Sequence, residues 1–168
     1  MLSVEEAYAR VMASFGPLEP VVTPLLDALG LVLAVDVASP FDLPPLANSG
    51  MDGYAVRSED IRNASPDSPS QLRVIGLVAA GQRPSKTVDP GTAIRIMTGA
   101  PVPGGADTVV PFEETDEVPR RQAGLSLDEI AILSGLPPGR NVRPAGEDVG
   151  RGQLVLEAGI VLRPAEIG

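Results

Sequence analysis

The stretch Ser39-Pro40-Phe41-Asp42-Leu43-Pro44-Pro45 divides the chain into two parts of different character. Its prolines exclude a helix and a central strand, because proline fixes φ and has no N–H to donate. We therefore place a domain boundary at this stiff, extended connector. Helical signals and one apolar run precede it, and short apolar segments between turn signals follow it.

The part before the connector predicts two helices and a strand. Ser3 and Glu6 have the spacing of a capping box, apolar residues follow at helical spacing, and Gly16-Pro17 ends the pattern. Thr23-Pro24 predicts the start of a second, shorter helix. The apolar run 31–37 predicts a strand. We expect the first helix to serve packing rather than chemistry.

The part after the connector predicts short strands separated by turns such as Asp89-Pro90-Gly91. Strands are expected at residues 53–57, 71–79, 92–96, 107–112 and 129–133. Residues 153–156 and 160–162 predict a hairpin. Pro164 opens a single helical turn, which has no reason to exist alone, so we expect the parent chain to continue beyond Gly168.

These patterns predict a fold that is mainly β with a few short helices. A β-rich domain, residues 39–141, is inserted into a smaller α+β domain made of residues 17–38 plus 142–168. Residues 1–16 form a separate N-terminal helix. With 43% hydrophobic but only 3% aromatic residues among 168, the core must be built from aliphatic side chains.

The charge and residue content exclude several classes of function. The net charge is −9, and no basic run exists to neutralise phosphates, so a nucleic-acid partner is not expected. The chain contains neither Cys nor His, which removes disulfides, thiol and imidazole chemistry and most transition-metal sites. A bound metal would therefore be a hard cation such as Mg²⁺. No apolar run reaches the ~18 residues of a membrane span, and the start is acidic, so we expect a cytoplasmic protein without a membrane partner.

Three segments carry residues suited to chemistry. In Asn48-Ser49-Gly50-Met51-Asp52-Gly53-Tyr54-Ala55-Val56-Arg57, the Gly-flanked Asp52 can bind a metal, position a water or act as a general base. It can equally be a turn residue that bonds its own backbone. In Arg95-Ile96-Met97-Thr98-Gly99-Ala100-Pro101-Val102-Pro103, the turn and the Thr98 hydroxyl can approach an oxyanion, or the prolines merely fix the path of a loop.

The third segment is Asn141-Val142-Arg143-Pro144-Ala145-Gly146-Glu147-Asp148-Val149-Gly150. Its adjacent carboxylates and nearby arginines can hold Mg²⁺ and an anionic ligand, or Arg143 can pair with Glu147 in a solvated turn. The acidic run 113–117 is interpreted differently. It predicts a self-repelling, solvated loop, because it lacks the spacing and central glycine of a calcium-binding EF-hand.

Together and in this order, the three segments resemble the MoeA family of molybdopterin molybdenumtransferases, which includes the E domain of gephyrin. Gly81-Gln82 and Ser39-Pro40 also fit the family pattern. The resemblance covers nearly the whole chain and identifies it as the N-terminal part of such a protein. Gly50 replaces a commonly found alanine, which should be harmless, and residues 115–128 match nothing in the pattern.

The resemblance implies an enzyme that inserts molybdenum into adenylylated molybdopterin, with a divalent cation, and releases AMP. It implies a multidomain homodimer in which this chain provides one side of a cleft that a third domain completes, and the N-terminal helix, residues 1–16, would pack on that third domain. The chain alone is then expected to be inactive, because catalysis needs positioned groups from both sides. By resemblance, the catalytic residues are Asp52, Thr98 and Asp148.

Further roles follow from charge and from the same motifs. Cofactor-binding positions are Arg95, Gly99 and Arg143, and the metal ligands are Asp52 and Glu147 for Mg²⁺. A cation at Asp52 would offset the acidic surface toward anionic substrates. Two alternatives stay open: a non-catalytic dimerisation or scaffolding module of the gephyrin type, and an unrelated small-anion or Mg²⁺-binding protein complete at Gly168.

Overall fold

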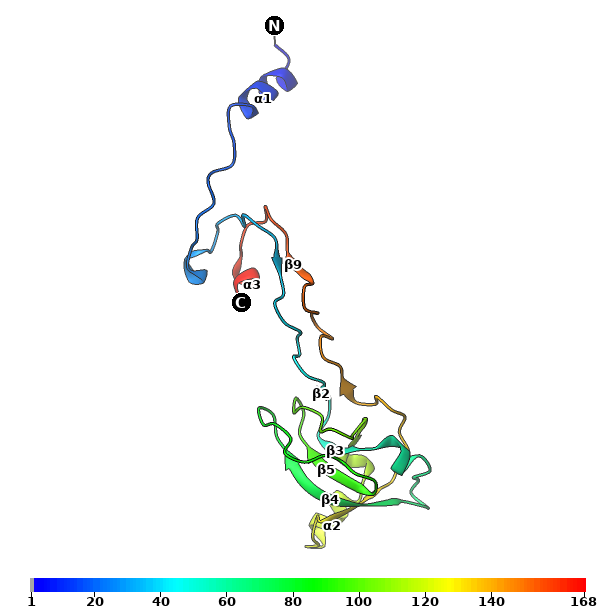
Figure 1. The fold of residues 1–168 in the computed structure, drawn as a ribbon. Helices are drawn as coiled ribbons and strands as arrows, with labels where there is room; N and C mark the ends of the chain where they lie inside the picture. Colours follow the sequence, from blue (N-terminus) through cyan, green and yellow to red (C-terminus); the bar gives the residue numbers. More distant parts are fainter. Residues whose placement is uncertain (1) are drawn as a thin grey trace. The chain divides into compact units, whose positions relative to one another are not determined.

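The computed structural model describes residues 2–168, and its regular structure is mainly short strands with three short α-helices (Figure 1). The predicted fold class is confirmed. Contacts group the chain into two compact units: unit 1 comprises the described residues up to Ala38 together with Leu154–Gly168, and unit 2 comprises Ser39–Gln153. Residues 142–153, which the sequence analysis assigned to the small domain, cluster with unit 2.

Unit 1 begins with helix α1 (Val4–Met12). The Ser3 hydroxyl accepts from the Glu6 amide at 3.1 Å, and the Glu6 carboxylate accepts from the Ser3 amide at 3.0 Å, as the capping box predicts. The second helix predicted from Thr23-Pro24 is only one 3₁₀ turn, η1 (Leu25–Asp27). Pro24 rather than Thr23 occupies its N-cap, and no side chain caps it, so nothing extends the turn.

The strands of unit 1 pair across the chain rather than within a hairpin. β1 (Val37–Ala38) is antiparallel to β9 (Leu154–Leu156), and the amide of Leu33 donates to Ile160 O at 2.9 Å. The predicted hairpin of residues 153–156 and 160–162 is therefore wrong, because segment 31–38 takes both of its arms as partners. The predicted strand 31–37 shrinks to β1 and an isolated bridge between Val32 and Val161. Helix α3 (Pro164–Ile167) ends the chain.

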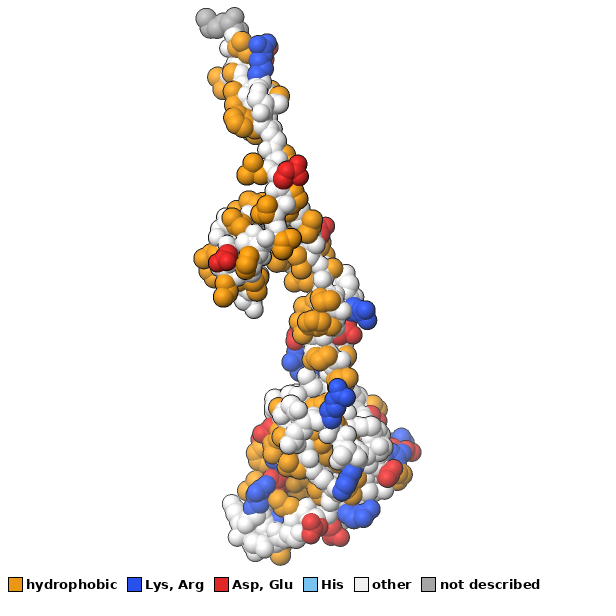
Figure 2. Space-filling view, turned by 60° about the vertical axis from the view of Figure 1, so that its left-hand side comes forward, with side chains coloured by type: hydrophobic (Ala, Val, Ile, Leu, Met, Phe, Trp, Pro, Cys, Tyr) orange, Lys and Arg blue, Asp and Glu red, His pale blue; other side chains and the backbone are white. Residues whose placement is uncertain are grey.

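Many large apolar side chains of unit 1 are exposed, and none of the residues of α1 is buried (Figure 2). In α1 the exposed apolar residues follow one another at helical spacing, as for a helix that packs against another surface. The most exposed apolar residues of the unit are Val4, Phe15, Leu18, Val21, Val22 and Leu26.

Unit 2 is built on a five-stranded sheet in the order β6-β3-β5-β4-β7, of which Figure 1 labels β3, β5 and β4. Its strands are β3 (Gly53–Val56), β4 (Ser70–Val78), β5 (Thr92–Ile96), β6 (Thr108–Pro111) and β7 (Glu129–Ile132). β4 runs parallel to β5, and the other neighbours are antiparallel. The remaining elements of the unit are β2 (Asn48–Ser49), η2 (Ser58–Ile61), η3 (Phe112–Glu114), α2 (Glu117–Gln122) and β8 (Val142–Arg143).

Two hydrophobic clusters lie among the strands, and alternation along each strand decides which cluster a side chain joins. Tyr54 and Val56 join one cluster and Ala55 the other. On β5, Ala93 packs with Tyr54, whereas Ile94 and Ile96 pack with Ala55. The same alternation assigns Arg95 to the face that carries Tyr54.

Candidate functional site

The first two chemistry-bearing segments meet where β3 begins and β5 ends. These strands are antiparallel with Gly53 opposite Ile96. The residue before β3 and the residues after β5 therefore lie at the same end of the sheet. Asp52 precedes β3, and Thr98 follows β5 by two residues. Gly53 is required here because a Cβ would lie only 1.9 Å from Val110 O on the neighbouring strand.

The Asp52 carboxylate is exposed but fixed in direction. Its Oδ1 accepts from the Thr98 amide at 2.6 Å and from the Thr98 hydroxyl at 2.7 Å. The bonds from the Thr98 amide and from its hydroxyl lower the pKa of Asp52 below its ordinary value; burial opposes them less strongly, and the nearby charge of Arg95 adds a still smaller lowering. Asp52 is therefore ionised at neutral pH.

The amides of the turn after Thr98 bond within the protein. Gly99 has a φ of 77°, and its amide donates to Ser49 O at 2.8 Å. The Ala100 amide donates to Met97 O at 3.0 Å, and Ala100 O accepts from the Ser49 amide at 2.9 Å. The turn thus holds Asp52 and the strand β2 rather than presenting a row of free amides.

The third segment contacts the same end of the sheet through Asn141. Its carbonyl accepts from the Gly50 amide at 2.9 Å, and its Nδ2 donates to Val109 O at 2.8 Å. Asn141 adopts a φ of 58°, a conformation that asparagine tolerates better than most residues. β8 then pairs with β2, with Arg143 opposite Asn48, so the structure brings parts of all three segments together.

Glu147 and Asp148 both pair with Arg143 in an exposed turn. The Arg143 Nε donates to Glu147 Oε2, and its Nη2 donates to Asp148 Oδ1 at 2.7 Å. The amide of Asp148 donates to Leu43 O at 2.9 Å, which ties the turn to the proline-rich connector. All three side chains are exposed, so solvent screens these ion pairs and a ligand can exchange with them at low cost.

Arg95 lies on β5 close to the Asp52 turn, with its side chain only 12% exposed. Its Nη1 donates to Gly53 O and to Ile96 O, each at 3.0 Å. Its Nε lies 2.9 Å from Glu117 Oε2. The donors of this guanidinium are thus directed into the protein.

Glu117, which the sequence analysis placed in a solvated acidic loop, is 3% exposed, so that prediction is wrong for this residue. It begins helix α2, where Asp116 pairs with Arg120 and Glu117 with Arg121 at i,i+4 spacing. Burial alone would raise the pKa of Glu117, but hydrogen bonds from Tyr54 and Arg121 and the charge of Arg95 lower it. The i,i+4 pairing of acids with the following arginines was the signal that a helix begins here.

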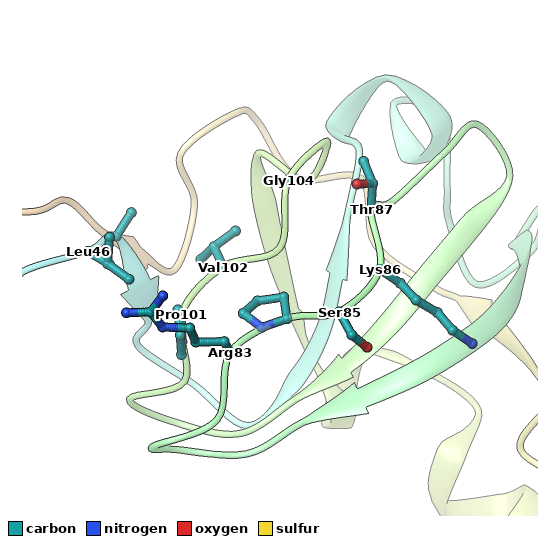
Figure 3. A pocket seen from close by; sticks show the side chains of 10 residues that line it. Leu46, Arg83, Ser85, Lys86, Thr87, Pro101, Val102 and Gly104 are labelled. Carbon is teal, nitrogen blue, oxygen red and sulfur yellow. The ribbon is translucent and has the colours of Figure 1, made fainter.

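An open cavity of about 520 Å³ is lined in part by the residues that follow Thr98 in the sequence, Pro101 and Val102 (Figure 3). Its lining includes Leu46, Arg83, Pro101 and Val102. Lys86 also borders it, but its Nζ donates to Ile75 O at 2.6 Å. Neither Asp52 nor Thr98 lines this cavity, so it flanks the carboxylate site without containing it.

Across residues 2–168 the structure places no three Asp or Glu side chains where they could share one metal ion. In the same residues, no helix is both long enough and apolar enough to cross a bilayer.

The fold matches that of a solved molybdopterin biosynthesis protein. The crystal structure of the molybdopterin biosynthesis MoeA protein from Pyrococcus horikoshii OT3 superposes with a TM-score of 0.77 at 38% identity, over 86% of this chain and 36% of that one. The family described as MoeA N-terminal region (domain I and II) matches residues 2–168. The chain belongs to the MoeA family.

Similar proteins of known family carry the name molybdopterin molybdenumtransferase. Molybdopterin molybdenumtransferase 2 of Mycobacterium tuberculosis is 44% identical over 168 residues, which are 100% of this chain and 40% of that protein. Molybdopterin molybdenumtransferase of Synechococcus elongatus is 43% identical over 142 residues, 84% of this chain and 33% of that protein. The chain thus spans about two fifths or less of the length of these relatives.

Proposed function

We propose that this chain provides one side of the active site of a molybdopterin molybdenumtransferase, and that Asp52 carries its chemistry. The proposed reaction in molybdenum cofactor biosynthesis takes molybdenum from molybdate, inserts it at the dithiolene of adenylylated molybdopterin, and releases AMP. The observation that carries the proposal is the exposed, ionised Asp52 carboxylate, held in one direction by two bonds from Thr98. The supporting relation is 44% identity to a named molybdopterin molybdenumtransferase along the whole chain.

Asp52 and Thr98 have different roles in this proposal. Oδ1 of Asp52 is engaged by Thr98, whereas Oδ2 has no partner within the described residues and is available to a proton or a cation. The Thr98 hydroxyl has a single proton, which it donates to Asp52, so it orients the carboxylate rather than donating to an oxyanion. Asp148 and Arg143 stay candidates for a ligand that opens their surface ion pairs.

The proposed cation is Mg²⁺, which the protein would hold through one or two carboxylates. Mg²⁺ commonly keeps several waters and binds through one or two carboxylates plus substrate phosphates. Asp52, with its free Oδ2, would hold it here, and Glu147 is the second candidate, although Arg143 engages it. When bound, the ion would offset negative charge on the phosphates and polarise the phosphoanhydride.

The exposed apolar surface of unit 1 supports the proposal of a homodimer. Apolar patches of this kind mark protein interfaces. In the scaffolding alternative unit 1 also forms the dimer, but unit 2 has no catalytic role. Replacing Val4 and Tyr8 in α1 by Ser tests whether α1 contributes to the dimer, and the mass of the protein in solution is measured. We retain a cytoplasmic location, without nucleic-acid or membrane partners, as an expectation.

The experiment uses a chimera in which this chain replaces the matched N-terminal region of the Mycobacterium tuberculosis relative. Molybdate-dependent AMP release is expected from the chimera and not from the 168-residue chain alone. Asp52→Asn should lower turnover about a hundredfold or more, as loss of a positioned acid or base does. If a folded Asp52→Asn chimera keeps the turnover of the wild-type chimera, Asp52 has no catalytic role and the scaffolding alternative is favoured.

A further inference from the structure

The Arg95 guanidinium ties together the two strand ends that carry Asp52 and Thr98. Its Nη1 donates to Gly53 O and to Ile96 O, both at 3.0 Å. Gly53 directly follows Asp52, and Ile96 is the last residue of β5, two residues before Thr98. A single group therefore bonds the backbone on both sides of the Asp52–Thr98 pair.

Glu117 fixes the other side of the same guanidinium. Its carboxylate lies 2.9 Å from Arg95 Nε and accepts from Nη2 at 3.4 Å. The two side chains are 12% and 3% exposed, so water competes little with the pair. Glu117 is itself held by Arg121, whose Nη2 lies 2.9 Å from Glu117 Oε1.

Two aromatic rings lie beside the guanidinium. Its Cζ is 5.3 Å from the centroid of the Tyr54 ring and 5.6 Å from that of Phe112, within cation–π range. The Phe112 amide also donates to Asp52 O at 3.2 Å. The rings that flank Arg95 thus belong to residues whose backbones border Asp52.

We propose that Arg95 is a positioning residue for the Asp52–Thr98 pair and that Glu117 orients it. Toward the Asp52–Thr98 pair Arg95 acts through the backbone, since it donates to the carbonyls of Gly53 and Ile96 and makes no hydrogen bond to the Asp52 carboxylate. Lysine cannot reproduce this arrangement, because an ammonium group lacks the planar fork of donors that reaches carbonyls and carboxylate at once. The consequence for turnover rests on the proposed function of Asp52; the positioning itself does not.

A purely stabilising role is the competing explanation, because a buried ion pair can support folding without directing a neighbouring site. The two roles differ in what happens to the Thr98–Asp52 bond in a protein that still folds. NMR can observe that bond in the 168-residue chain as scalar coupling between the Thr98 amide nitrogen and the Asp52 carboxylate carbon. The exchange rate of the Thr98 amide proton gives a second measure of the same bond.

The experiment compares Arg95→Lys with Arg57→Lys. Arg57 is the matched control, since it follows the other end of β3 and pairs with Glu59 at 2.7 Å. In Arg95→Lys we expect loss of the coupling and exchange of the Thr98 amide about tenfold faster or more, at unchanged overall fold. Arg57→Lys should keep both. In the chimera, Arg95→Lys should lower kcat roughly 10–100-fold at nearly unchanged KM, as misplacement of a reacting group does.

A folded Arg95→Lys chain with wild-type coupling and exchange at Thr98 overturns the positioning role, whatever Asp52 does in catalysis. If Arg95→Lys does not fold, Glu117→Gln decides, because it keeps the size of the side chain and removes the charge that pairs with Arg95. Faster Thr98 exchange in folded Glu117→Gln supports the proposal, and unchanged exchange overturns it. Unchanged turnover in Asp52→Asn would overturn the proposed function and leave these NMR results standing.

Discussion

The two glycines that flank Asp52 should respond oppositely to the same substitution. In Gly53→Ala, the new Cβ would lie 1.9 Å from Val110 O and 2.8 Å from Val110 C. These are backbone atoms of β6, which pairs with β3 along Gly53–Val56, so no flexible side chain can move aside. An ordinary contact begins at 3.4 Å, so the two strands would have to separate by about 1.5 Å.

The expected loss follows from these distances. Overpacking in a well-packed core costs about 1–3 kcal/mol, and each buried backbone group that loses its partner costs about 1–3 kcal/mol more. The gain from restricting the unfolded chain is only about 0.4–1 kcal/mol. We therefore expect Gly53→Ala to lower the free energy of unfolding by about 3–5 kcal/mol.

Gly50→Ala is the matched control, because its Cβ would lie 3.5 Å from Asn141 O, an ordinary contact. Its stability should stay within about 0.5 kcal/mol of wild type or rise slightly. Urea denaturation followed by circular dichroism, including the near-ultraviolet signal of the buried Tyr54, measures both. Gly53→Ala within about 0.5 kcal/mol of wild type, or an equal loss in Gly50→Ala, would refute the reasoning.

Three further predictions concern charge. Because the folded-state pKa of Glu117 is lowered from 4.5, its stabilisation is present above that value and lost as pH falls through the lower folded pKa. Glu117→Gln should thus cost about 2–4 kcal/mol at pH 7 and less below about pH 4; an equal cost at both in urea denaturation contradicts this. Thr98→Val should raise the pKa of Asp52 part of the way toward 3.8, because it removes the hydroxyl bond and keeps the amide bond; carbon-13 NMR of the carboxyl group measures this, and an unchanged pKa argues against the hydroxyl bond as a cause. Millimolar Mg²⁺ should move the thermal midpoint of this chain by about 1 °C or less, whereas a shift of several degrees that Asp52→Asn abolishes would reveal a complete cation site within it.

The sheet of unit 2 was predictable because alternation and turn residues act locally. The segments 92–96 and 129–133 become β5 and β7 almost as expected. Unit 1 was less predictable, because many of its apolar side chains are exposed and an apolar run there does not mark a buried strand. The partners of segment 154–162 also lie more than a hundred residues earlier, where no local pattern indicates them.

The candidate site was predictable in its residues but not in its contacts. The motif around Asp52 and the motif around Thr98 were identified separately, and only the register of β3 against β5 brings them into hydrogen-bonding distance. Arg95 occupies a strand position whose alternation places it beside Tyr54, which the sequence could have indicated. Its partner Glu117 could not be found in this way, because an acidic run predicts solvent exposure until a buried arginine neutralises it.

The most direct test of the central claim is AMP release by the chimera and by its Asp52→Asn variant, after both are shown to fold and to bind adenylylated molybdopterin. Asparagine keeps the size of the side chain and can still accept from Thr98, so only the charge and the proton acceptor are lost. The account predicts that the variant binds substrate but turns it over about a hundredfold more slowly or worse. Equal turnover by the two proteins would contradict it and leave the pair of Asp52 and Thr98 as architecture.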